Sequence, residues 1–123
     1  MAQKAAEEPS IAPLDRERIA AGFARAVNMT ADELREWLAS DLSVSVGWKG
    51  VDGMLHESVG HASGRWIADI LETPGFALTD ADYCHMRKVV GFIRRHLAQE
   101  PANPVTSRWR YSLMNWGHDP LKG

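Results

Sequence analysis

The chain has 123 residues, of which 45% are hydrophobic and 24% charged, which is typical of a soluble globular domain and excludes a disordered or fibrous protein. Its uninterrupted apolar runs fall far below the roughly 18 residues that span a bilayer, so no membrane partner is expected. The first ten residues lack the basic start and apolar stretch of a signal peptide. The single Cys84 fits a reducing compartment, so we expect a cytoplasmic protein.

Charge is unevenly distributed along the chain. Residues 1–82 carry 7 Lys or Arg against 14 Asp or Glu, whereas residues 83–123 carry 7 against 2. The total of −2 therefore combines an acidic part of −7 with a basic part of +5. A basic segment of this kind indicates either a polyanionic partner or pairing with the acidic part of the chain.

The N-terminal third predicts a tail followed by two helices. Residues 1–13 show no periodicity and are expected to form a flexible tail, with a single helical domain over 14–123. Apolar side chains recur at helical spacing over 14–28, which predicts the first helix. Thr30 and Glu33 match a capping box, which predicts a second helix over 31–40.

The middle of the chain predicts a long loop and a third helix. Residues 41–57 contain three glycines and no helical repeat, so we expect a loop. Ser58 is a suitable cap for a helix that ends before Pro74. The residues expected on the buried face of this helix are Val59, Ala62, Trp66, Ile67, Ile70 and Leu71.

Two further helices are expected in the basic third. Thr79 with Asp82 resembles a capping box at the start of a helix over 80–99, and the last helix begins near Ser107 and stops at Gly117. With no convincing strand and no repeat, the pattern predicts an all-α fold, a compact bundle of four or five helices with a disordered N-terminal tail.

The helix over 80–99 has two distinct faces. One face is apolar and is expected to be core: Tyr83, Met86, Val89, Val90, Ile93 and Leu97. The opposite face carries Arg87, Lys88, Arg94 and Arg95 around small residues, Gly91 among them. Cations beside such a furrow would let a phosphodiester backbone approach closely, although a solvated face or a face covered by carboxylates has the same pattern.

A set of basic residues is therefore the candidate nucleic-acid site, with double-stranded DNA as the expected partner and no sequence specificity implied. Arg108 and Arg110 open the last helix and would extend the basic face, while Lys49 and Arg65 lie further away in sequence. The candidate nucleic-acid-binding residues are Arg87, Lys88, Arg94, Arg95, Arg108, Arg110, Lys49 and Arg65.

Two other features allow more than one interpretation. The segment ESVGHASGR, residues 57–65, places Gly60 and Gly64 one helical turn apart, which suits close helix packing or an anion at a helix start. Trp48 lies in the glycine-rich sequence VGWKG, where it could stack on a base, dock a partner or fold back onto the core.

Two alternatives to DNA binding remain. One is a protein-interaction module, for example a homodimer that pairs acidic helices over 15–35 with the basic helix. The other is a small metal-dependent or histidine-based enzyme that uses His61, His85 and nearby carboxylates. The five histidines do not form an HExxH motif, so no catalytic residue, metal ligand or cofactor is assigned.

Three segments together resemble a known family. The sequences ESVGHASGR, DADYCHMRKVVGFIRRHLAQ and RWRYSLMNWGHDPLK are similar to those of small bacterial proteins catalogued as a domain of unknown function, some of which are labelled DNA-binding. The resemblance covers roughly residues 30–122. It implies a helical domain and an association with DNA, and it supplies no catalytic residues.

Overall fold

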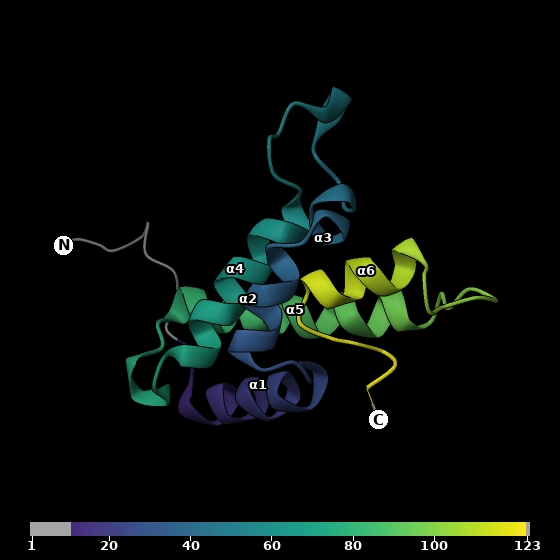
Figure 1. Cartoon of the computed structure of the whole chain (residues 1–123). Helices are drawn as coiled ribbons and strands as arrows, with labels where there is room; N and C mark the ends of the chain where they lie inside the picture. The colour runs from purple at the N-terminus through teal and green to yellow at the C-terminus, as the bar shows by residue number, and fades with distance from the viewer. Residues whose placement is uncertain (1–10, 123) are drawn as a thin grey trace.

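The computed structural model describes residues 11–122, and within them the chain forms α-helices and short 3₁₀ turns but no strand (Figure 1). The six α-helices are α1 (Pro13–Ala26), α2 (Ala31–Leu38), α3 (Asp41–Ser45), α4 (Val59–Glu72), α5 (Asp80–Leu97) and α6 (Arg108–Asn115). The two 3₁₀ turns are η1 (Val51–Gly53) and η2 (Gly75–Ala77). The predicted all-α class is confirmed. Most of the expected tail, residues 1–10, lies outside the described residues, and α1 begins at Pro13.

Local capping accounts for where the main helices begin. The Thr30 hydroxyl accepts a hydrogen bond from the Glu33 amide at 3.1 Å, and the Glu33 carboxylate accepts one from the Thr30 amide at 2.8 Å. Thr79 and Asp82 make the same reciprocal pair at the start of α5. Both predicted capping boxes are therefore confirmed. Each one satisfies amides that have no partner inside the helix.

The helices enclose one apolar core. Helix α1 packs along α5, α2 packs along α4, and α6 contacts each of α2, α3, α4 and α5 (Figure 1). The side chains that are almost completely buried come from several of these helices: Leu34, Ile67, Val89, Ile93 and Leu113. Burial of each contributes roughly 1.5–3 kcal/mol, so packing between helices is the main source of stability.

The expectation of a loop over 41–57 was wrong in part. Residues 41–45 form α3, capped by the Ser40 hydroxyl, which accepts a hydrogen bond from the Ser43 amide at 3.3 Å. A helix of five residues is too short to show a periodic pattern, and buried contacts of Ser43 and Val46 hold it in place. The remainder, with η1 at its tip, projects from the helical body (Figure 1).

The predicted buried face of α4 was also wrong in part. Val59, Trp66 and Leu71 are between 37% and 39% exposed, whereas Gly60 and Gly64 are buried. A Cβ atom on Gly64 would lie 2.4 Å from the Asn115 carbonyl oxygen. The small residues therefore seat α4 directly against α6, which is the packing interpretation of ESVGHASGR. Close backbone contact, rather than the apolar stripe, sets the orientation of this helix.

Candidate nucleic-acid interface

The basic side of α5 is exposed as predicted. Tyr83, Met86, Val89 and Ile93 are buried on the predicted core side of the helix. The prediction was wrong for Leu97, which lies in the last turn of α5 and is 37% exposed, and Val90 is only half-buried. The opposite side presents four exposed cations, and none of them forms an ion pair with a carboxylate among residues 11–122. We call this set the α5 basic face: Arg87, Lys88, Arg94 and Arg95.

The α5 basic face has a regular geometry. Arg87 and Arg94 are seven residues apart, as are Lys88 and Arg95, so each pair is separated along the helix axis by about 10.5 Å. Gly91 lies between them, and a Cβ atom at Gly91 would be 3.1 Å from a terminal guanidinium nitrogen of Arg95. The predicted furrow is therefore occupied at Gly91 by the Arg95 guanidinium, which places a cation at its centre.

Arg110 does not join this face. It lies two positions after Arg108, so the two side chains point to nearly opposite sides of α6. Arg110 donates two hydrogen bonds to Asp119, at 3.1 and 3.2 Å, and a third to the Val105 carbonyl. Burial is the largest single effect and raises the pKa of Asp119, but the hydrogen bonds from Arg110 and the Leu121 amide, together with the charge of Arg110, leave that pKa below its usual value. Arg108 is exposed and donates to the Ser45 carbonyl at 3.3 Å.

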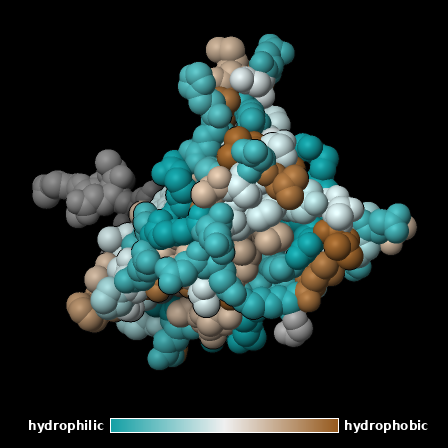
Figure 2. Space-filling view, viewed as in Figure 1, coloured by the Kyte–Doolittle hydropathy of each residue, from teal (hydrophilic) through white to brown (hydrophobic). Residues whose placement is uncertain are grey.

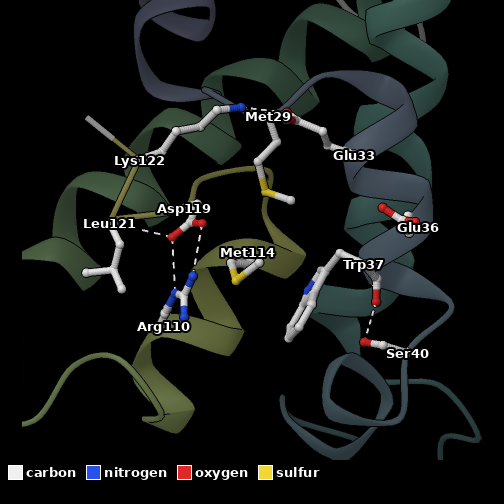
Figure 3. A pocket seen from close by; sticks show the side chains of 10 residues that line it. All are labelled: Met29, Glu33, Glu36, Trp37, Ser40, Arg110, Met114, Asp119, Leu121 and Lys122. Atoms are coloured by element: carbon white, nitrogen blue, oxygen red, sulfur yellow. Dashed lines mark hydrogen bonds and ion pairs between the residues drawn. The ribbon is translucent and has the colours of Figure 1, made fainter.

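Arg110 instead lines a pocket of about 520 Å³ between α2, α6 and the C-terminal segment. Figure 3 shows the Arg110–Asp119 and Lys122–Glu33 pairs at this pocket. The Lys122 ammonium lies 2.5 Å from a Glu33 carboxylate oxygen. Both cations of the pocket are thus paired with carboxylates, and Glu36 adds a further acidic group to its wall. The pocket therefore offers no free positive charge to a phosphate.

Arg65 and Lys49 lie near the projecting segment. Arg65 donates two hydrogen bonds to the Glu57 carboxylate, at 2.8 and 2.6 Å. The Arg65 guanidinium is the main reason why the pKa of Glu57 is lowered to about 2. Lys49 is half-buried and lines a small hollow with Glu57 and His61. Arg65 is therefore neutralised, and Lys49 stands beside a carboxylate.

Sequence reasoning missed Arg25 on α1. Arg25 lines a hollow of about 260 Å³ together with Arg94 and His118, and it forms no ion pair among the described residues. It was missed because the N-terminal part of the chain is acidic overall. A usable signal exists in the sequence, since no Asp or Glu lies three or four positions from Arg25. Exposed positive charge therefore continues from α5 onto α1.

His61 and His85 are held by contacts within the fold. The Ser63 hydroxyl lies 2.8 Å from Nε2 of His85, and both residues are buried. His61 contacts the Glu57 carboxylate with one ring nitrogen and the Leu38 carbonyl with the other. Among residues 11–122, no three His, Cys, Asp or Glu side chains lie close enough together to hold a metal ion.

The described residues thus form an all-α domain in which one helix presents a row of exposed cations. None of the helices over 11–122 is long and apolar enough to cross a membrane. The family model described as "Protein of unknown function (DUF3140)" matches residues 22–114, and the chain belongs to this family. The match confirms the resemblance to a domain of unknown function, and the matched segment contains all of α5. No curated protein and no solved structure matches the chain.

Proposed function

We propose that this protein binds double-stranded DNA without acting on it as an enzyme, by contacts between phosphates and the α5 basic face. One observation carries the proposal: four exposed cations share one side of a single helix, and no carboxylate among the described residues pairs with them. Arg65 and Arg110 are not part of the proposed surface, because each already forms an ion pair, Arg65 with Glu57 and Arg110 with Asp119.

Physical chemistry favours the unpaired cations over the paired ones. A phosphate that binds Arg94 releases counterions and breaks no existing ion pair, whereas a phosphate that binds Arg110 must compete with Asp119. A helix of 18 residues also holds its side chains at fixed spacing, so several contacts can form together. Contacts of this kind position a protein on DNA without reading its bases, so we propose no sequence preference.

The proposed surface extends beyond α5. Arg25 borders the same hollow as Arg94 on one side of the helix. Arg108 is exposed at the start of α6, and its guanidinium contacts only a carbonyl oxygen among the described residues. Both are therefore additional candidates for phosphate contacts.

The test is fluorescence anisotropy of a labelled DNA duplex titrated at several salt concentrations. We expect Arg94→Glu to weaken duplex binding by about tenfold, equivalent to about 1.4 kcal/mol, and Arg94→Glu/Arg95→Glu to abolish it. Arg18→Glu is the matched control, because it changes the net charge equally and Arg18 is 79% exposed on α1. Equal losses for Arg94→Glu and Arg18→Glu would mean that only net charge matters.

The same variants test the alternative of self-association. If the α5 basic face pairs with acidic helices of a second copy, Arg94→Glu/Arg95→Glu changes the sedimentation coefficient of the protein in the absence of DNA. Under our proposal that coefficient stays constant. Absence of duplex binding by the wild-type protein at low salt would refute the proposal.

A further inference from the structure

The five tryptophans differ in how they use their indole N–H groups. Three donate at 2.6–2.8 Å: Trp37 to Asn115, Trp66 to Asp82 and Trp109 to the His96 carbonyl. Trp48 and Trp116 donate to no acceptor among residues 11–122. These two side chains border the same hollow. Two aromatic side chains from distant parts of the sequence therefore line one hollow.

This hollow, which we call the Trp48 hollow, has a volume of about 230 Å³. Its apolar part is formed by Val59, Phe92 and the ring of Trp116, and Trp48 is 63% exposed at its edge. Trp116 is only 4% exposed, and its Nε1 lies beside Gly60, where a Cβ atom would be 2.9 Å away. The absence of a side chain at Gly60 therefore lets the Trp116 indole pack directly against α4, which fixes this ring in the wall of the hollow.

The charged groups of the Trp48 hollow are all positive. Lys88 and Arg95 line it, and both belong to the α5 basic face. The Ser112 hydroxyl on α6 also lines it. No carboxylate of the described residues does so. A ligand that matches this lining has a flat apolar body, hydrogen-bond acceptors and negative charge, which is the chemistry of a nucleotide.

The size of the hollow restricts the ligand further. Pockets that enclose whole drug-sized molecules usually measure roughly 300–1,000 Å³, so 230 Å³ suits a single base with its sugar and phosphate outside. A neighbouring hollow of about 430 Å³ shares Val59, Lys88 and Trp116 with it. That hollow also contains the Glu57 carboxylate, whereas Lys88 and Arg95 join the Trp48 hollow directly to the α5 basic face. Phosphates that flank a bound base can therefore lie along α5, which favours a base within DNA over a free nucleotide.

We propose that the Trp48 hollow binds one unpaired base of a DNA strand whose phosphates lie on the α5 basic face. This inference rests on the proposed function, since Lys88 and Arg95 serve both. The base stacks on the Trp48 indole, and its acceptors receive hydrogen bonds from donors that line the hollow, such as the Ser112 hydroxyl. The protein therefore prefers DNA that contains an unpaired nucleotide over a fully paired duplex.

The segment that carries Trp48 projects from the helical body, where a ligand can reach it. In Figure 2 the projecting segment stands clear of the body and carries hydrophobic as well as hydrophilic residues. Its backbone is held by hydrogen bonds from the Leu55 amide to the Lys49 carbonyl and from the Val59 amide to the Trp48 carbonyl, both at 2.8 Å. Trp48 is therefore exposed on a segment whose backbone is held by hydrogen bonds at both ends.

The experiment compares a flush duplex with the same duplex carrying one bulged thymine. Stacking of a base on an aromatic side chain is worth about 1–3 kcal/mol, so we expect the wild-type protein to bind the bulged duplex about tenfold more tightly. Trp48→Ala should remove this preference and leave flush-duplex affinity unchanged, while Trp48→Phe should retain most of it. Phe76→Ala is the matched control, because Phe76 is a 93% exposed aromatic outside the hollow.

The outcomes separate this inference from the proposed function. Equal binding of both duplexes, with Arg94→Glu still weakening both, overturns the base site and leaves phosphate binding in place. No binding of either duplex overturns both proposals. If thymidine monophosphate competes as well as the bulged duplex, the hollow is a free-nucleotide site and the DNA assignment is wrong. Trp48-dependent binding to anionic lipid vesicles without a preference for the bulge also overturns it.

Discussion

The indole ring of Trp66 stacks on the imidazole of His85, with ring centroids 4.1 Å apart and planes inclined by 6°. The stack continues through Trp116, whose centroid lies 6.1 Å from that of His85, to Phe92, 4.2 Å further on. These rings belong to α4, α5 and the C-terminal end of α6, so the column ties three helices together. It also encloses a titratable group in an aromatic environment.

The buried imidazole makes stability depend on pH. Burial is the main reason why the pKa of His85 is lowered to about 4, with a smaller contribution from Lys88, while Asp82 opposes the shift. Because the folded-state pKa lies below the unfolded value of about 6.5, the unfolded chain takes up a proton first as pH falls. The contribution of the neutral His85 to the free energy of unfolding is fully present above pH 6.5 and is lost as pH falls from about 6.5 to 4. Denaturant unfolding at several pH values should show a loss on the order of 3 kcal/mol.

The matched variant for this effect is His85→Gln, which keeps a polar group near Ser63 and does not titrate. It should lower stability at neutral pH because the ring stack is lost, and it should flatten the pH dependence between 6.5 and 4. An unchanged slope in this variant would assign the titration to another group. The carboxylate of Glu57 acts in a lower window, since its contribution disappears only as pH falls from about 4.5 towards 2.

Substitution of Gly64 tests the close packing of α4. In Gly64→Ala the new methyl group would lie 2.4 Å from the Asn115 carbonyl oxygen and 2.7 Å from a Leu38 methyl group. We expect a loss of about 1–3 kcal/mol in denaturant unfolding, because backbone on one side prevents relaxation. Gly75→Ala is the control, since a methyl group there meets nothing within 4 Å. Equal stability of the two variants would contradict the proposed packing.

The buried Asn115 side chain links three parts of the fold. Its carbonyl oxygen accepts hydrogen bonds from the Trp37 indole at 2.7 Å and from the Ser43 hydroxyl at 2.6 Å, and its amide donates to the Ser43 carbonyl. Asn115→Ala leaves these groups without partners, so we expect a loss of about 2–4 kcal/mol. Ser43→Ala removes one of these hydrogen bonds and should cost less. Thermal unfolding monitored by circular dichroism measures both changes.

Arg25 provides a quantitative test of the extended basic surface. If it contacts one phosphate, Arg25→Ala should reduce the slope of log affinity against log salt by about 0.9. Arg18→Ala, which removes the same charge from the same helix, should leave that slope unchanged. The measurement is duplex binding by anisotropy over a range of salt concentrations. A slope that is unchanged in Arg25→Ala would exclude this residue from the DNA contact.

Helix boundaries were predictable because their causes are local. Thr30 and Thr79 each cap an amide only three residues away, so a short stretch of sequence contains both partners of the interaction. The basic side of α5 could also be predicted, because helical periodicity depends only on the spacing of residues within one helix. His85 was not expected to be buried, because its burial depends on Trp66 and Trp116 from other helices.

The sequence by itself determined the all-α class, the capped starts of the main helices and the four cations on one side of α5. The tertiary structure alone decided the short helix α3, the orientation of α4, the pairing of Arg65 and Arg110 with carboxylates and the juxtaposition of Trp48 with Lys88 and Arg95. The physical reason is the range of the interactions. Capping and periodicity act within a few residues, whereas ion pairs, close glycine contacts and hollows join segments that lie far apart in the sequence.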